Sequence, residues 1–210
     1  MSAAPLRATP DVRAVTLAVV GDEPPHGGFG AELLAALARR PRRIAPKFFY
    51  DAAGSALFDR ICELPEYYPT RTELGLLERY GREMAECIGA GAEIIEFGAG
   101  SSRKVRLLLD ALRAPRRFVP IDISAEHLHE AAARLRADYP ALEVLPIAAD
   151  FTRRLLLPAA AGPRVGFFPG SSIGNFTPDD ALAFLRRTAA VLERGLLIGV
   201  DLVKNPARLH

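Results

Sequence analysis

Residues 94–101 read Ile-Ile-Glu-Phe-Gly-Ala-Gly-Ser, and this stretch decides the fold. A short apolar run that ends in two glycines, followed by helical spacing at residues 104–113, is typical of a buried strand, a loop and a helix. Gly98 and Gly100 have no side chains, so the backbone there can come close to a ligand. Taken alone, the glycines are a weak signal, because many α/β proteins have glycines at this point for packing.

Strands and helices continue to alternate after this stretch. The expected strands are residues 118–121, 142–147, 165–168 and 196–200, and the expected helices are 125–138 and 179–192. Ser124 and Thr177 stand where the N-caps of these helices should be. This alternation predicts right-handed crossovers and a parallel sheet covered on both faces. The ligand of such a sheet lies beyond the carboxyl ends of the strands, where the strand order reverses.

The first 90 residues have a different pattern. They are rich in Pro, Gly and Ala up to about residue 45, and the expected helices are 31–40, 55–62 and 70–88. Thr70 and Glu73 have the spacing of a capping box at the start of the last of these helices. We therefore expect an N-terminal helical extension over residues 1–90 and a Rossmann-like ligand-binding domain over residues 91–210.

Composition excludes several classes of protein. The chain has 210 residues, of which half are hydrophobic, with 27 Lys and Arg against 25 Asp and Glu. That length suits one α/β domain with a short extension. The near balance of charge does not suggest a nucleic-acid binder, and no apolar run reaches the ~18 residues that span a bilayer. The basic run at 39–43 is interpreted as a solvated helix end rather than an anion-binding patch.

Cysteine and histidine usage adds two expectations. Cys62 and Cys87 have no CxxC spacing and stand among apolar residues, so we expect buried thiols in a reducing cytoplasm. The four histidines are scattered without metal-ligand spacing, so no metal site is expected.

Three acids stand at the ends of three expected strands, namely Glu96, Asp122 and Asp150. Asp122 follows Gly100 by 22 residues, where an acid commonly pairs with a ribose hydroxyl. The dinucleotide fingerprint would need a third glycine where Arg103 stands, and the Glu96 carboxylate would repel a pyrophosphate. S-adenosylmethionine, which carries a sulfonium and an amino group but no phosphate, fits better than NAD. The alternative is that these acids only cap helices and loops.

Two further features are compatible with that cofactor. Lys104 could balance its carboxylate or pair with Glu96. Asp150 offers an acceptor for the adenine amino group, and Phe151 offers a ring beside it.

Six segments occur in a specific order, namely residues 50–58, 64–71, 96–101, 119–124, 170–176 and 201–204. With them the chain, over roughly residues 45–208, resembles the histidine-specific Nα-methyltransferases of ergothioneine biosynthesis. Tyr-Tyr-Pro-Thr-Arg at 67–71 and Ser-Ile-Gly-Asn at 172–175 are not general methyltransferase features. The resemblance implies an α/β class I methyltransferase fold, with a Rossmann-like parallel sheet and S-adenosylmethionine bound by residues of the 91–210 region.

The resemblance also implies roles for individual residues. The implied cofactor contacts are Gly98, Lys104, Asp122, Asp150 and Phe151. The implied contacts with the substrate, L-histidine, are Tyr67 and Asn175, with Tyr50 nearby.

We expect Asn175 and Tyr67 to orient the substrate amine for three successive methylations rather than to act as a strong base. An amide such as Asn175 can orient an amine lone pair without adding a charge. The alternative for Tyr67 is a half-buried core tyrosine whose hydroxyl reaches water.

Members of the family continue well past the segment at 201–204, with the last sheet strands and a substrate-recognition domain. We therefore expect this chain to lack those parts. Residues 196–200, which are apolar on both faces as in a central strand, would then form an open edge able to pair with a partner. Two alternatives remain: a non-catalytic S-adenosylmethionine-binding module or pseudoenzyme, and a nicotinamide-dependent oxidoreductase, which Glu96 and Arg103 disfavour.

Overall fold

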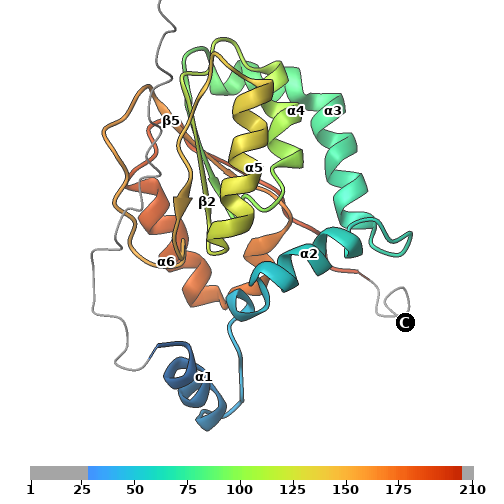
Figure 1. The fold of residues 1–210 in the computed structure, drawn as a ribbon, viewed down its shortest axis with the longest axis vertical. Helices are drawn as coiled ribbons and strands as arrows, with labels where there is room; N and C mark the ends of the chain where they lie inside the picture. The colour runs from blue at the N-terminus through green and yellow to red at the C-terminus, as the bar shows by residue number, and fades with distance from the viewer. Residues whose placement is uncertain (1–27, 205–210) are drawn as a thin grey trace, which may run out of the picture.

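The computed structural model describes residues 28–204. Its helices are α1 (Gly28–Ala38), η1 (Pro46–Phe49), α2 (Ala52–Ile61), α3 (Tyr68–Ile88), α4 (Arg103–Ala111), α5 (Ala125–Asp138), η2 (Ser172–Asn175) and α6 (Pro178–Ala189), where η marks a 3₁₀ turn. Its strands are β1 (Glu93–Phe97), β2 (Arg117–Asp122), β3 (Glu143–Val144), β4 (Ile147–Ala148), β5 (Arg164–Phe168) and β6 (Leu196–Ile198). Figure 1 shows α1 standing apart from the sheet and its covering helices.

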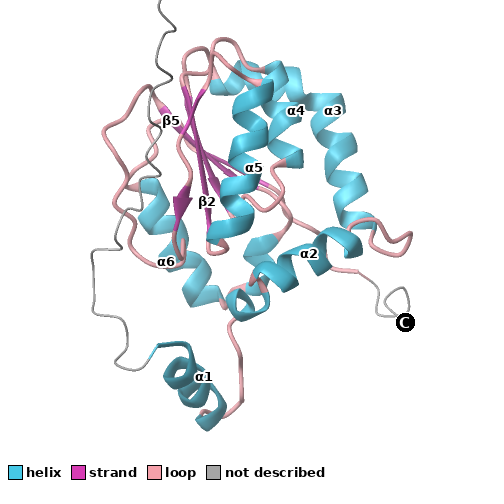
Figure 2. Ribbon diagram, in the orientation of Figure 1, coloured by secondary structure: helices cyan, strands magenta, loops and turns pink. Residues whose placement is uncertain are grey.

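The sheet is parallel, as the alternation predicted. Its strand order is β3-β2-β1-β5-β6, with β4 also paired to β2. The chain moves outward from β1 to β3 on one side and then returns to place β5 on the other side of β1. The strand order therefore reverses between β1 and β5, and the strands of Figure 2 lie between two sets of helices.

Alternating side chains give the sheet two packed faces. Ile94 belongs to a core cluster shared with α3, α4 and α5, whereas Ile95 and Phe97 pack toward α6. On the α6 face the rings of Phe168 and Phe184 lie 4.8 Å apart between centroids, at the centre of an aromatic cluster. Because side chains alternate along a strand, Glu96 lies on the face that carries Ile94, toward α3 and α4.

The third predicted strand differs from the prediction. The sequence indicates one strand over residues 142–147, but the structure has two two-residue strands, β3 and β4. Pro146 stands between them and has no N–H to donate to the ladder, which explains the break. The N–H of Leu145 still donates to the carbonyl of Phe118 at 2.9 Å. β2 therefore keeps a neighbour along much of its length.

The expected capping box at the start of α3 is wrong. The helix begins at Tyr68, two residues earlier than predicted, with Pro69 in its first turn. Thr70 is consequently inside the helix, and its hydroxyl donates to Cys62 Sγ at 3.3 Å. The Glu73 carboxylate points away from the helix start and reaches the carboxyl ends of the strands.

The other predicted caps and the cysteines give mixed outcomes. Thr177 caps α6 and accepts a hydrogen bond from the N–H of Asp180, as expected. Ser124 stands at the N-cap of α5, but its side chain makes no capping bond. Cys62 is partly buried, while Cys87 is exposed, so the expectation of a buried thiol is wrong for Cys87. Cys87 lies off the buried stripe of α3, which instead contains Ala85 and Ile88.

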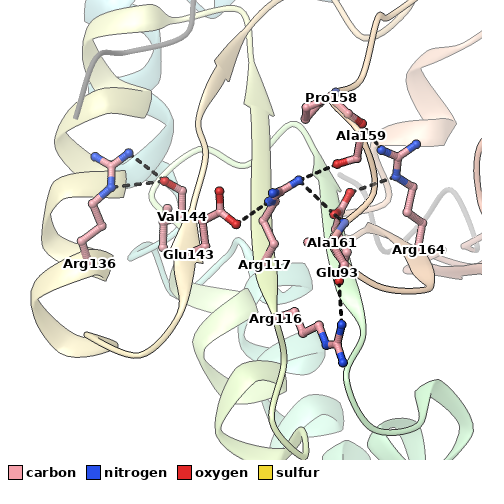
Figure 3. A network of polar contacts seen from close by, with 10 residues as sticks. All are labelled: Glu93, Arg116, Arg117, Arg136, Glu143, Val144, Pro158, Ala159, Ala161 and Arg164. Atoms are coloured by element: carbon pink, nitrogen blue, oxygen red, sulfur yellow. Dashed lines mark hydrogen bonds and ion pairs between the residues drawn. The ribbon is translucent and has the colours of Figure 1, made fainter. Parts of the chain in front are cut away.

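A buried acid lies at the amino end of β1. Glu93 is fully buried, and its carboxylate receives Arg164 Nε at 2.9 Å and Arg117 at 3.3 Å. The N–H of Ala161 donates to the same carboxylate at 2.6 Å, and Arg117 also donates to the carbonyl of Ala159. Figure 3 shows these contacts joining β1, β2 and β5 to the segment before β5. Glu93 therefore fastens this end of the sheet.

The opposite side of the sheet ends at β6. The predicted strand over residues 196–200 is shorter, at residues 196–198, and all three residues are half-buried. Within residues 28–204, β6 pairs only with β5, so its outer edge is open. No helix in the described part of the chain is long and apolar enough to cross a membrane.

Candidate functional site

A cleft of about 1340 Å³ lies at the carboxyl ends of β1, β2 and β5. This is the edge where strand order reverses and where parallel α/β sheets bind their ligands. All eight residues predicted for the site line the cleft, namely Tyr50, Tyr67, Gly98, Lys104, Asp122, Asp150, Phe151 and Asn175. The fold therefore brings together residues from six separate parts of the sequence.

The loop after β1 forms the floor of the cleft. Gly98 has a φ of 74° and Gly100 a φ of 48°, in the left-handed region that glycine adopts most easily. The N–H of Gly98 donates to the carbonyl of Ile121 at 2.8 Å, which ties this loop to the end of β2. A side chain at Gly100 would meet no atom within 4 Å, so the space above it is open.

Asp122 is held at the end of β2 by backbone donors. Its Oδ2 accepts from the N–H of Gly100 at 3.0 Å, and its Oδ1 accepts from the N–H of Ser124 at 3.0 Å. Each oxygen keeps a further lone pair, because a carboxylate can accept about four hydrogen bonds. The carboxylate is therefore fixed in direction and still able to bind a hydroxyl donor.

Glu96 is the most unusual acid of the cleft. Its side chain is buried, with 2% of the residue exposed, and its Oε2 has no hydrogen-bond partner among the described residues. Burial raises the pKa of Glu96 well above its ordinary value, and the cation of Lys104 only partly opposes this. An unpaired buried oxygen is costly, and such groups concentrate at functional sites.

Lys104 stands in the first turn of α4 and lines the same cleft. Its Nζ lies 2.6 Å from Glu73 Oε2. Glu73 was not among the predicted site residues. The sequence left open whether Lys104 would balance the cofactor carboxylate or pair with Glu96, and the structure pairs Lys104 with Glu73. Lys104 remains close enough to Glu96 for its positive charge to oppose part of the rise in the pKa of that carboxyl.

Asp150 has a cationic neighbour that the sequence did not indicate. Lys47 of η1 lies 3.0 Å from Asp150 Oδ2, and the N–H and hydroxyl of Thr152 donate to Oδ1. Burial alone would raise the pKa of Asp150, but the hydrogen bonds from Thr152 and Lys47 outweigh it and lower the pKa. Asp150 is therefore an ionised acceptor at this end of the cleft.

Phe151 lies between the aromatic cluster and the glycine loop. Its ring centroid is 5.7 Å from that of Phe168, and a Cβ added at Gly98 would stand 3.4 Å from its ring edge. The ring is partly exposed, so it offers an apolar wall to the cleft.

The other wall of the cleft is aromatic and neutral. Phe58 of α2 makes edge-to-face contacts with Tyr50, at 5.7 Å, and with Tyr67, at 5.9 Å. Burial is the main cause that raises the pKa of both tyrosines. Asp122 and Cys62 add to it at Tyr50, while Cys62, Tyr50 and then carboxylates add to it at Tyr67, so both phenols stay neutral. Asn175, at the end of η2, is exposed and lines the cleft.

The sequence did contain a signal for Glu73. The buried stripe of α3 includes Thr70, Leu77, Gly81 and Ala85, and position 73 falls on it at the i+3 and i+4 spacing. An acid on a buried helix stripe needs a partner, which points to a role in tertiary structure rather than in capping. No comparable local signal marked Lys47.

The sheet order, the glycine loop and the acid-lined cleft define a Rossmann-like α/β protein with its ligand site at the switch point. The family described as histidine-specific, SAM-dependent methyltransferases matches residues 29–210, and the chain belongs to this family.

Similar proteins agree with this membership. The chain is 44% identical over 183 residues to a histidine N-alpha-methyltransferase of Mycolicibacterium smegmatis, covering 85% of this chain and 57% of the relative. It is 40% identical over 195 residues to a histidine N-alpha-methyltransferase of Mycobacterium tuberculosis, covering 90% of this chain and 60% of the relative. This chain therefore spans less than two thirds of the length of these relatives.

Among solved structures, a possible exported protein from Bordetella parapertussis is similar in fold. The TM-score is 0.54 at 17% identity, covering 73% of this chain and 55% of that one. At this identity the likeness concerns the fold alone.

Proposed function

We propose that this chain carries the cofactor-binding and amine-orienting part of an S-adenosylmethionine-dependent methyltransferase that acts on the α-amino group of L-histidine. The expected product is trimethylhistidine, and the family resemblance implies that this methylation is a step of ergothioneine biosynthesis. Membership of the family and the names of the two mycobacterial relatives support the reaction class. The observation that carries the proposal is the buried, unpaired oxygen of Glu96 at the base of the cleft.

The residues of the cleft suit this cofactor. Glu96 and Asp122 offer acceptors to an amino group and to ribose hydroxyls, and Lys104 offers a cation to a carboxylate. Asp150 accepts from the adenine amino group, with Phe151 as the apolar surface beside the ring. No phosphate has to approach Glu96. Gly98 keeps the space beside the Phe151 ring free of side-chain atoms, because a Cβ there would stand 3.4 Å from the ring edge.

The cofactor supplies an activated methyl group, so the protein has to orient a neutral amine and keep water away. This is catalysis by positioning. Asn175 and Tyr67 orient the amine, because an amide and a neutral phenol form hydrogen bonds without holding a charge beside the sulfonium. Burial of Tyr67 supports this role, since it raises the pKa of the phenol and keeps its proton in place. Tyr50 lies behind Phe58 in the same wall and shapes the substrate side.

The same proposal assigns roles to the two regions of the chain. Within the expected regions 1–90 and 91–210, residues 28–90 serve as the helical extension and substrate lid, and residues 91–204 serve as the S-adenosylmethionine-binding domain; residues 1–27 and 205–210 lie outside the described residues. The enzyme acts in the cytoplasm on a small amino acid. The open edge of β6 admits a further strand from another part of the protein or from a partner, because its outer N–H and C=O groups face no strand within the described residues.

The test is cofactor binding followed by methyl transfer. Calorimetry with the folded chain should detect binding of S-adenosylmethionine, and mass spectrometry should detect methylation of L-histidine. Asn175→Ala should lower the rate by about 100-fold with little change in cofactor affinity, since it misplaces the amine rather than the cofactor. The surface variant Glu83→Gln is the control.

Failure to bind millimolar S-adenosylmethionine in folded protein would rule out the proposal. Binding of S-adenosylmethionine without methylation of L-histidine would mean that this chain performs cofactor binding alone.

A further inference from the structure

Glu73 lies on the buried side of α3, with only 17% of its side chain exposed. It comes from a helix that precedes the sheet in the chain, yet its carboxylate reaches the carboxyl ends of three strands. None of the roles proposed above uses it.

The Glu73 carboxylate makes two polar contacts with different loops. Its Oε2 lies 2.6 Å from Nζ of Lys104, at the start of α4. Both of its oxygens lie 2.9 Å from the N–H of Gly170, which follows β5. Hydrogen bonds to an ionised acceptor are about twice as strong as those between neutral groups. Glu73 therefore joins the first turn of α4 to the loop after β5.

A third strand end leaves space for the same carboxylate. A Cβ added at Gly199, directly after β6, would stand 1.9 Å from Glu73 Oε1. Gly199 has no side chain, and its N–H donates to the carbonyl of Phe168 at 3.0 Å. The carboxylate thus fits against the backbone between β5 and β6.

The Gly170 contact sets the start of the loop that presents Asn175. Gly170 has a φ of 81° and Ser171 a φ of 56°, both left-handed, and η2 begins immediately afterwards. A backbone in this region is strained at a residue other than glycine, and the surrounding structure has to hold it there. The charge-assisted bond from Gly170 to Glu73 is such a constraint.

The Lys104 contact acts on the cofactor side. Lys104 lies between two acids, with Glu73 as its ion-pair partner and Glu96 close enough to feel its charge. Glu73 thus controls where the ammonium of Lys104 stands relative to the unpaired oxygen of Glu96.

We propose that Glu73 is a positioning residue that couples the cofactor-binding end of α4 to the amine-orienting loop after β5. It touches neither substrate nor cofactor in this assignment. It holds Lys104 and Gly170 through one carboxylate, so that a cofactor that engages Lys104 also changes the placement of Asn175. The assignment rests on the proposed function, because Lys104 and Asn175 receive their roles there.

The experiment compares four variants of the full 210-residue chain. Glu73→Ala removes both contacts, and Glu73→Gln keeps an oxygen for Gly170 but loses the charge facing Lys104. Gly199→Ala displaces the Glu73 carboxylate without changing its chemistry, because the new methyl group would stand 1.9 Å from the present position of Oε1. Glu78→Gln is the matched control, since it makes the same chemical change at an exposed position of the same helix.

The first readout needs no ligand. Amide hydrogen exchange at Gly170, followed by NMR, should accelerate at least about 10-fold in Glu73→Ala, because a bond to a charged acceptor is lost. Gly199→Ala should reproduce this, Glu73→Gln should restore most of the protection, and Glu78→Gln should match the unaltered chain. Equal protection in Glu73→Ala and Glu78→Gln would overturn the anchoring role. Global unfolding would instead accelerate exchange throughout the core, including at Ile95.

The second readout is the response of the Asn175 side-chain NH₂ resonance to S-adenosylhomocysteine. The unaltered chain and Glu78→Gln should show a shift on binding. Glu73→Ala and Gly199→Ala should still bind, with the shift largely lost, and Glu73→Gln should recover part of it. An undiminished shift in Glu73→Ala would overturn the coupling. If S-adenosylhomocysteine does not bind the unaltered chain, the proposed function and the coupling that rests on it are both contradicted. Hydrogen exchange at Gly170 would still test separately whether Glu73 anchors that loop.

Discussion

The two buried glutamates of β1 stand three residues apart and have opposite surroundings. Glu93, at the amino end of the strand, is fully buried and receives Arg117, Arg164 and a backbone N–H. Glu96, at the carboxyl end, is nearly as buried and has an oxygen without a hydrogen-bond partner in residues 28–204. Burial raises the pKa of Glu96 well above its ordinary value.

This difference separates stability from ligand binding within one strand. A satisfied buried acid joins elements, as Glu93 joins three strands to the segment at residues 158–161. An unsatisfied one lowers stability unless something else supplies its partner. Parallel α/β proteins place their ligand sites at the carboxyl ends of strands, and the difference between Glu93 and Glu96 follows that division.

The largest effect should come from removing the satisfied acid. Glu93→Ala leaves Arg117 and Arg164 without their shared counter-charge, and both arginine side chains are mostly buried. We expect the free energy of unfolding to fall by about 3–5 kcal/mol, as when one partner of a buried ion pair is removed. Urea titration would measure this. A loss of unfolding free energy as small as that of a surface substitution would show that water solvates the two arginines in the variant.

A smaller effect is expected at Asp122. Asp122→Ala leaves the N–H groups of Gly100 and Ser124 without their acceptor. We expect a loss of about 1–3 kcal/mol in the free energy of unfolding. Affinity for S-adenosylmethionine should also fall at least about 10-fold, the equivalent of 1.4 kcal/mol. Calorimetry and urea titration on the same sample would separate the two. Unchanged affinity would remove Asp122 from the cofactor site.

The third prediction concerns the sign of a pH dependence. The folded state holds the proton of Glu96 more tightly than the unfolded state, because its pKa is raised above the ordinary value of 4.5. The contribution of this group to stability is therefore complete below that ordinary value and is lost as pH rises through the raised pKa. Glu96→Gln removes this loss, so the variant should gain stability relative to the unaltered chain as pH rises.

Urea titrations at mildly acidic and mildly alkaline pH would measure the effect of Glu96→Gln. A constant difference between the two proteins would mean that Glu96 titrates normally. The same variant should bind S-adenosylmethionine more weakly, which Glu93→Gln should not do if it folds.

The smallest effect should be at Glu143. Its side chain is 54% exposed and pairs with Arg117 at 2.8 Å, at the rim of the Glu93 network. Exposed ion pairs contribute about 0–1 kcal/mol, so Glu143→Ala should change the free energy of unfolding by no more than that. A larger loss would show that Arg117 needs Glu143 in order to hold Glu93.

Local pattern was sufficient to predict most of the fold. Apolar runs bounded by glycine and proline predicted β1, β2 and β5, and α5 begins and ends where its pattern indicated. The errors have local physical causes. Pro146 divides the third strand, and Pro69 allows α3 to begin before the apparent capping box.

The site was predicted less completely, because its contacts are distant in sequence. The eight predicted residues line one cleft, and their roles remain proposals. The spacing of Thr70 and Glu73 predicts a capping box, whereas the backbone donor that Glu73 meets, Gly170, lies 97 residues further on. Lys47 and Asp150 are 103 residues apart. The residue spacing within a single helix or strand cannot predict such pairs, because they form only when distant segments pack together in the fold.

The missing side chain at Gly199 links the evolution of two positions that are distant in sequence. A methyl group there would stand 1.9 Å from Glu73 Oε1, so alanine at 199 would displace that carboxylate from its contacts with Gly170 and Lys104. A shorter residue at 73 would leave space for a side chain at 199, but it would lose the same contacts. We therefore expect positions 73 and 199 to vary together among related sequences, with glycine at 199 wherever glutamate stands at 73.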